Sequence, residues 1–245
     1  MPVSTRGKFI VALFLGLGVP AADAQDVPGG RPPAVSAGSP GTPPGDDAGM
    51  PELFRIKRAR FDAEPASPAA SHVADWVVFT GDNRRQPFMV IDKIDAKVFV
   101  FDAGGRLLRA APALLGLAER DVDEPGVGDL PLSDIHAEIR VTPAGRFVAQ
   151  MGRNLKGEDI LWLDYSAGLS LHRVVTGNKA ERRQERLDSP TPRDNRISYG
   201  CINVPVPFFD EVVQPAFAGS GGVVYILPET RPPSAVFGSY TLGDQ

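Results

Sequence analysis

The sequence predicts a mainly β fold of the β-rich α+β class, in which the strands form a sandwich or barrel with one or two short helices. Three observations support this class. Runs of about five to seven residues rich in β-branched and aromatic side chains recur, and turn-forming residues separate them. One stretch, 206–217, has its apolar residues at helical spacing. The part of the chain that carries these patterns, 72–232, has about 160 residues, enough for one domain with one core.

The chain opens with the features of a secretory signal peptide, which we expect to occupy residues 1–24. Arg6 and Lys8 precede an apolar run, Phe9–Val19, and Ala22-Asp23-Ala24 provides a small-x-small cleavage site. A transmembrane anchor is the alternative, but it needs nearly twice as many apolar residues. We therefore expect an exported protein, periplasmic or otherwise outside the inner membrane, that is not stably inserted in a membrane after cleavage.

Residues 25–71 are predicted to form a disordered linker. Up to about residue 51 they are rich in proline, glycine, alanine and serine, so this stretch buries too little apolar surface to offset the entropy of ordering. Residues 54–61 alternate apolar and basic side chains, which fits either an edge strand or a basic surface segment. Residues 233–245 are predicted to be a tail.

The charge balance argues against one class of partner. The chain has 26 Lys and Arg against 30 Asp and Glu, a net charge of −4, which is unfavourable for sequence-independent binding to nucleic acid. Residues 117–134 are acidic, and a calcium site is one interpretation of them. Their spacing follows no EF-hand loop, and acidic solvated loops are common. We predict no metal, no cofactor and a monomer.

The strands are predicted in chain order from alternation and turn signals. Asp102–Gly105 is typical of a hairpin turn between two of them, and Ser166–Gly168 separates another pair. In 206–217, Pro207 suits the first turn of a helix. The predicted strands are Trp76–Thr80, Phe88–Asp92, Lys97–Phe101, Leu107–Pro112, Phe147–Ala149, Ile160–Tyr165, Leu169–Val175 and Val223–Pro228.

Cys201 is the candidate nucleophile. It is the single cysteine of the chain, so an exported protein cannot use it for an internal disulfide. Gly200 precedes it and can adopt backbone angles closed to other residues, which lets a substrate approach the amides of Gly200 and Cys201. An exposed thiol with amide donors beside it is an arrangement suited to acyl transfer.

His172 is the candidate partner of this thiol. A histidine between Leu171 and Arg173 on a predicted strand is by itself more often a packed residue than a catalytic one. However, the chain has three histidines, His72 precedes the predicted domain, and a thiol nucleophile needs a base or a cation near it at neutral pH. His136 has no neighbours at ligand spacing and is expected to be packed or at the surface.

The stretch Ser198-Tyr199-Gly200-Cys201-Ile202-Asn203 resembles the signature of the L,D-transpeptidase catalytic domain of the YkuD type. That signature runs Ser/Thr-His-Gly-Cys-hydrophobic-Asn after an upstream histidine, so Tyr199 stands where the family usually has a second histidine. The resemblance extends over residues from about 86 to 228. It implies Cys201 and His172 as catalytic residues, with Gly200, Tyr199, Ser198 and Asn203 forming or supporting the oxyanion site.

Two further stretches bear on substrate binding. Thr142-Pro143-Ala144-Gly145-Arg146-Phe147 resembles a turn that borders the substrate cleft in the family, so Thr142 and Arg146 become candidate substrate contacts besides a scaffold role. About 25 residues separate His172 from Ser198, more than the family usually has. The excess lies in a basic loop, 179–196, which is either a substrate-binding lid or a solvated insertion. Arg196, at its end, is a candidate substrate contact.

The resemblance implies an L,D-transpeptidase that acts on peptidoglycan stem peptides through a Cys201 thioester and forms cross-links or attaches another amine. Two alternatives stay open. One is an L,D-carboxypeptidase or other hydrolase on the same scaffold. The other is a degenerate domain that binds peptidoglycan without turning it over. The reactivity of Cys201 separates the enzyme from the binding domain, and product analysis with and without an acceptor amine separates transfer from hydrolysis.

Overall fold

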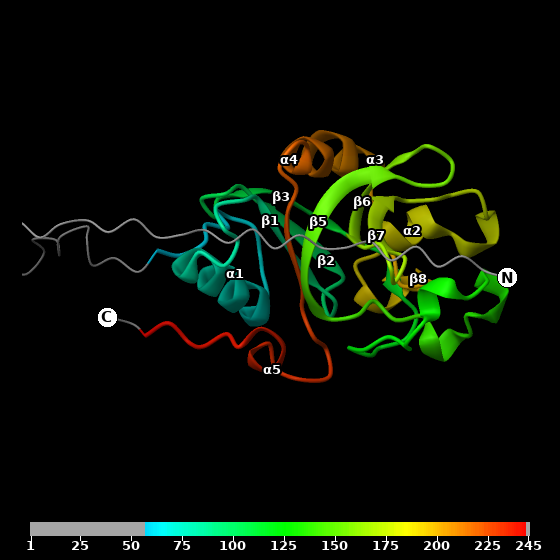
Figure 1. The fold of residues 1–245 in the computed structure, drawn as a ribbon, viewed down its shortest axis with the longest axis horizontal. Coiled ribbons are helices and arrows are strands. Elements are labelled where there is room, and N and C mark those ends of the chain that lie inside the picture. The colour runs from blue at the N-terminus through cyan, green and yellow to red at the C-terminus, as the bar shows by residue number, and fades with distance from the viewer. Residues whose placement is uncertain (1–56, 244–245) are drawn as a thin grey trace, which may run out of the picture. The chain divides into compact units, whose positions relative to one another are not determined.

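An eight-stranded mixed sheet dominates residues 57–243, the part of the chain that the computed structural model describes. Its strand order is β3-β2-β1-β10-β5-β6-β7-β9, and β4 and β8 form a separate pair. Strand β5 is the long curved arrow in the middle of Figure 1. The predicted β-rich class is thus confirmed. The strands are β1 Phe88–Asp92, β2 Lys97–Phe101, β3 Leu107–Pro112, β4 Leu115–Gly116, β5 Gly145–Arg153, β6 Asp159–Asp164, β7 Leu169–Arg173, β8 Arg196–Ser198, β9 Ile202–Val204 and β10 Gly222–Ile226.

The sheet curls until its two edges nearly meet. Strands β1, β2 and β3 form the predicted antiparallel meander, β10 joins β1 in parallel, and β7 joins β9 in parallel. Just after β3, the backbone of Leu114 donates to Asn203 of β9 at 2.8 Å and accepts from it at 3.0 Å. This contact links the two edge strands. Of the two predicted architectures, sandwich and barrel, the sheet is therefore closer to a barrel.

The inner face of the curled sheet encloses the larger hydrophobic cluster. Leu161, Leu171 and Ile202 pack there with the helical segment that follows β9. The predicted helix over 206–217 is confirmed, although its middle is wound as a π-helix. The helical elements are α1 Pro68–Thr80, α2 Arg183–Leu187, α3 Val206–Phe208, α4 Gln214–Phe217 and α5 Ser234–Phe237, with the π-helix η7 Phe209–Val213 and short 3-10 turns η2 Val127–Asp129, η3 Leu132–Asp134, η4 Ala137–Ile139, η5 Lys179–Glu181 and η6 Pro192–Asn195.

The predicted strand Trp76–Thr80 is wrong, because these residues end helix α1. Ser67 caps the helix by accepting from the Ala70 amide, and Gly81 ends it in the left-handed conformation. The helix packs Val73 and Val77 into a second cluster on the other face of the sheet. Val, Phe and Thr favour strands, but the two caps and this packing outweigh that preference. The boundary predicted at residue 72 therefore falls inside α1.

Ordered structure also extends upstream of α1. The Arg60 amide donates to Gly105 and its carbonyl accepts from Leu107, so this residue pairs with the start of β3, and Phe61 packs edge-on against Phe99. Of the two interpretations of 54–61, this favours edge pairing at Arg60, while residues 54–56 lie outside the described part. The predicted linker is thus too long at its C-terminal end, whereas the predicted signal peptide and the linker up to residue 56 lie outside the described part.

The predicted tail also contributes to the packing. Phe237 of α5 stacks edge-on against Tyr225, and Ser239 bonds His72 of α1 at 3.0 Å. Among residues 57–243, no helix combines the length and the apolar character needed to cross a bilayer.

A buried network of four charged residues ties the sheet to the segments around the predicted site. The ammonium group of Lys93 is fully buried and pairs with Asp121 at 2.9 Å and with Glu229 at 3.1 Å. It also donates to the carbonyls of Arg120 and Thr142. Arg196 pairs with Glu229 from the other side. The start of the acidic segment and the strand before Cys201 are therefore anchored to the same buried charge network.

Candidate active site

The motif turn between β8 and β9 requires glycine at position 200. Gly200 has φ +132°, a conformation that residues with a side chain rarely adopt. A Cβ atom added there would lie 2.6 Å from the carbonyl oxygen of Val141. The expectation that Gly200 supplies special backbone geometry is therefore confirmed, and its role is to let the turn pass close to the backbone at Val141.

Side chains on both sides hold the turn in place. Ser198 donates to the Cys201 carbonyl at 2.7 Å, and Asn203 donates to the same oxygen at 3.2 Å. Thr142, which is fully buried, donates to the Gly200 carbonyl at 2.7 Å and accepts from the Gly116 amide at 2.8 Å. The carbonyls of Gly200 and Cys201 are thus satisfied from within the protein.

The backbone amides of the turn divide into one that is bonded and two that are not. The Gly200 amide, expected to be an oxyanion donor, donates instead to the Ser198 hydroxyl at 3.1 Å. Within residues 57–243 the amides of Tyr199 and Cys201 donate no hydrogen bond. These two are therefore the amides of the turn that can serve an oxyanion.

The parallel pairing of β7 and β9 brings His172 to Cys201. His172 lies opposite Asn203, which places the histidine beside the cysteine turn. Burial alone would raise the pKa of the Cys201 thiol, but the hydrogen bond to His172 and the charge of that imidazole outweigh it and lower the pKa. Burial would lower the pKa of His172, but the hydrogen bond and charge of Cys201 raise it. Each group thus favours the charged form of the other.

The tautomer of His172 follows from its other contact. The Nδ1 atom lies 2.7 Å from the carbonyl oxygen of Arg173. Because a carbonyl only accepts, Nδ1 carries a proton and Nε2 is left to exchange one with the thiol. This is the orientation that a base paired with a thiol nucleophile needs.

Two residues of the β6–β7 region contact the thiol and were not predicted. The Ser170 hydroxyl donates to Cys201 Sγ at 3.5 Å, and the thiol donates to the Gly168 carbonyl at 3.4 Å. The Ser170 contact helps to lower the pKa of Cys201. The sequence held a signal for Ser170, because residues i and i+2 of a strand share a face and Ser170 precedes His172 by two.

Cys201, Gly200 and Tyr199 line a pocket of about 150 Å³. Its other wall is formed by the acidic segment, 117–134, and by the residues that follow it, whose apolar members line the cavity: Val127, Leu130, Leu132, Ile135 and Ile139. The lid predicted at 179–196 contributes no residue to this lining. The wall across from Cys201 is therefore built by a different loop from the one that was expected. In the described part of the chain no three His, Cys, Asp or Glu side chains gather as metal ligands.

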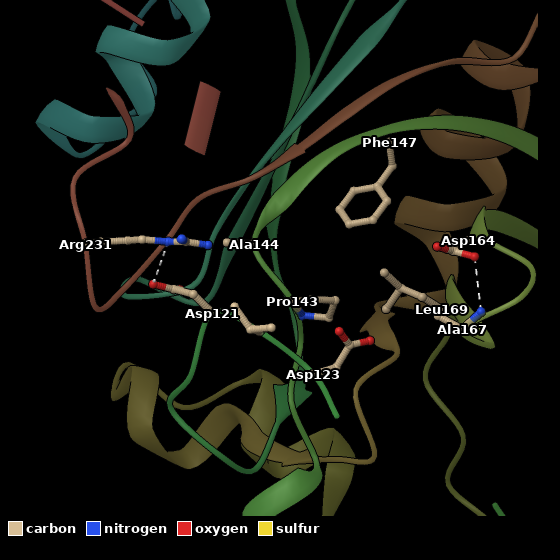
Figure 2. A pocket seen from close by; sticks show the side chains of 10 residues that line it. Asp121, Asp123, Pro143, Ala144, Phe147, Asp164, Ala167, Leu169 and Arg231 are labelled. Carbon is tan, nitrogen blue, oxygen red and sulfur yellow. Dashed lines mark hydrogen bonds and ion pairs between the residues drawn. The ribbon is translucent and has the colours of Figure 1, made fainter. Parts of the chain in front are cut away.

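A second pocket, of about 230 Å³, adjoins the first and shares Asp123, Pro143 and Leu169 with it. Figure 2 shows Asp121 paired with Arg231 and Asp164 bonded to the Ala167 amide, so both carboxylates are occupied. The side chain of Asp164 also accepts from Ser166, and these hydrogen bonds lower its pKa.

The three predicted substrate contacts have internal partners instead. Arg196 is buried and bonds Glu229 and the Lys93 carbonyl. Arg146 pairs with Asp82 at 2.6 Å. Thr142 is committed to the Gly200 turn, as described above. Their scaffold role is therefore what the structure supports, and none of the three lines the pocket at Cys201.

Tyr199, the departure from the family signature, lines the pocket with Cys201. The Arg140 guanidinium stacks on its ring, 4.0 Å from the centroid, and donates to the Ile135 carbonyl at 3.0 Å. The ring thus fastens the segment that faces Cys201 across the pocket. This is a shaping role, which agrees with the site support expected of this position.

The inserted loop is packed on the protein rather than raised above the site. Leu187 is buried with Leu114, Val174 and Ile197 in a small cluster of its own. Arg186 bonds the carbonyls of Glu181 and Asp194 within the loop. Arg183 donates to the Asn203 side chain at 2.7 Å. Most residues of the loop are exposed, so of the two interpretations, substrate lid and solvated insertion, the structure favours the insertion. The insertion also contacts the cysteine motif, through Arg183 and Asn203.

Gly200→Ala is expected to reduce the acylation of Cys201 at least 10-fold, because the added Cβ meets the Val141 carbonyl and the strained φ costs about 1–3 kcal/mol. The rate of labelling by a carbapenem, followed by intact mass, measures this. Gly177→Ala is the matched control, since a Cβ there meets nothing within 4 Å. Equal labelling of both variants would show that the turn tolerates the change.

Comparison with known proteins finds similarity in structure and none in sequence: no family model matches, and no curated protein matches. Among solved structures, an L,D-transpeptidase variant from Enterococcus faecium matches with 14% identity and a TM-score of 0.32 over 58% of this chain and 50% of its own. An L,D-transpeptidase from Mycobacterium smegmatis matches with 15% identity and a TM-score of 0.32, over 58% of each chain. A helical cell shape determining protein from Campylobacter jejuni matches with 14% identity and a TM-score of 0.37, over 64% of this chain and 55% of its own. The chain thus spans about half the length of these proteins.

Proposed function

We propose that the protein is an L,D-transpeptidase, a cysteine acyltransferase that acts on peptidoglycan stem peptides outside the inner membrane. The observation that carries the proposal is the pairing of Cys201 with His172 beside a pocket, with the thiol pKa lowered and the imidazole pKa raised. The substrate class comes from the resemblance of Ser198–Asn203 to the family signature, and the location comes from the predicted signal peptide.

The first half of the proposed reaction forms a thioester. Cys201 Sγ attacks the carbonyl carbon of the bond between the third residue of the stem and its terminal D-alanine. The amides of Tyr199 and Cys201, which have no acceptor among the described residues, stabilise the oxyanion. The carbon–nitrogen bond then breaks, and His172 gives its proton to the departing amine.

The second half releases the acyl group from the enzyme. An acceptor amine attacks the thioester carbonyl and loses a proton to His172, the carbon–sulfur bond breaks, and a new amide bond cross-links two stems. Water in place of the amine gives the shortened stem, which is carboxypeptidase action. No step requires a group beyond this chain and its two substrates.

The test incubates the exported form of the protein with purified disaccharide tetrapeptide, with and without an added acceptor amine, and analyses the products by mass spectrometry. We expect amide-linked products, either two stems joined or a stem joined to the added amine, that are absent with Cys201→Ala. A shortened stem under both conditions would instead identify a hydrolase. If wild type neither changes the substrate nor forms an acyl adduct, the proposal fails and a binding domain is left.

A further inference from the structure

Arg183, a side chain of the inserted loop, reaches the candidate site through a contact with Asn203. Arg183 is the first residue of α2, and its side chain is only 11% exposed. It forms an ion pair with Glu181 and donates to the Asn203 side-chain oxygen at 2.7 Å. The guanidinium group is therefore held in one orientation, which a loop of exposed basic residues would not require.

Asn203 passes this contact on to the nucleophile. Its amide nitrogen donates to the Cys201 carbonyl at 3.2 Å, beside the bond from Ser198 to the same oxygen. Asn203 is almost fully buried and lies opposite His172 in the pairing of β9 with β7. Because Arg183 binds the oxygen of the amide, it fixes the nitrogen towards Cys201.

The charge of Arg183 also acts on His172. Two charged groups bear on this imidazole: Cys201 from the motif turn, which raises the pKa of His172, and Arg183 from the inserted loop, which lowers it. The neighbouring guanidinium of Arg173 is committed to Asp210 and to the ring of Phe209. The inserted loop therefore opposes the stabilisation that the thiolate gives to the imidazolium.

We propose that Arg183 is a positioning residue of this site, which orients Asn203 behind Cys201 and places a fixed positive charge beside His172. The inference rests on the proposed acyl-transfer function. A fixed positive charge disfavours the protonated imidazole, so the imidazolium that forms when Cys201 attacks is a better proton donor to the departing amine. The inserted loop thus tunes the site without touching the substrate.

The test is the titration of the His172 ring by NMR, with His172→Ala used to assign its signal among the three histidines. Arg183→Gln is expected to raise the midpoint by about half a pH unit, because one nearby positive charge is lost. Arg183→Lys keeps the charge and is expected to titrate close to wild type. Arg182→Gln removes one charge from an exposed position of the same loop and is expected to change nothing.

Two results would overturn the inference. If Arg183→Gln shifts the midpoint no more than Arg182→Gln, Arg183 is not coupled to His172. If Arg183→Lys shifts it as far as Arg183→Gln while circular dichroism shows both folded, the effect is a rearrangement of the loop and not a loss of charge. The titration uses no substrate, so it tests the role of Arg183 even if wild type forms no products. Failure of this inference and failure of the proposed function can therefore be told apart.

Discussion

His172→Ala is expected to slow the acylation of Cys201 by a carbapenem about 100-fold or more at neutral pH. In wild type the lowered pKa of the thiol and the raised pKa of His172 define a pH window in which thiolate and imidazolium coexist. A free thiol, with a pKa of about 8.5, is mostly protonated at pH 7. The mutant loses the cation that stabilises the thiolate, so its labelling is expected to rise only at higher pH.

The measurement is the labelling rate by intact mass from about pH 5 to 9, with thiolate absorbance as a second signal. His72→Ala is the matched control, because His72 bonds Ser239 from α1 and lines neither pocket. A mutant at position 172 that labels as fast as wild type would mean that the pair is structural. For wild type, the labelling rate should fall at high pH only above the raised pKa of His172, since there the imidazolium loses its proton.

Lys93→Met is expected to lower the free energy of unfolding by about 3–5 kcal/mol, because it leaves buried carboxylates of Asp121 and Glu229 without their ammonium partner. Urea denaturation followed by circular dichroism measures the loss. Arg109→Met is the control, since its pair with Glu211 is exposed and is expected to contribute less than about 1 kcal/mol. If the two variants lose equally little, the buried pairs of Lys93 contribute no more to stability than the exposed pair of Arg109.

The same network makes the fold sensitive to acid. Burial opposes ionisation of Asp121, but the Thr230 hydroxyl, the Glu229 amide and Lys93 together lower its pKa to about 2. A carboxyl group whose pKa is lower in the folded state stabilises the protein above its unfolded pKa, near 4. This contribution is therefore present at neutral pH and is lost as the pH falls from about 4 towards 2.

Much of the sheet could be predicted from the sequence, because a half-buried strand leaves a local pattern. Strands β1, β2 and β3 were predicted with the bounds that the structure has, and the helical segment after β9 was recognised by its apolar spacing. The error at Trp76–Thr80 has a local cause. Its strand-favouring side chains were weighed without Ser67, which caps the helix upstream, or the sheet face that Val77 covers.

The pairing of Cys201 with His172, the candidate nucleophile and its partner, could also be predicted from the sequence. A lone cysteine after glycine and one well-placed histidine are chemical signals that do not depend on the path of the chain. The supporting residues were predicted less well. Ser198 and Asn203 hold the turn as expected, whereas Gly200 gives its amide to Ser198, and Arg196 and Arg146 bind carboxylates of the protein.

The sequence by itself determined the β-rich class, the turn that requires Gly200, and the identity of the Cys201–His172 pair, because each depends on residue type and short-range spacing. Only the tertiary structure decided which loops meet at that pair. Residues between Val127 and Ile139 line the pocket at Cys201, and Arg140, just after them, stacks on the ring of Tyr199. The basic loop reaches the same site through the bond from Arg183 to Asn203. Both contacts join residues far apart in the chain, and no local pattern encodes which distant partner a side chain will meet.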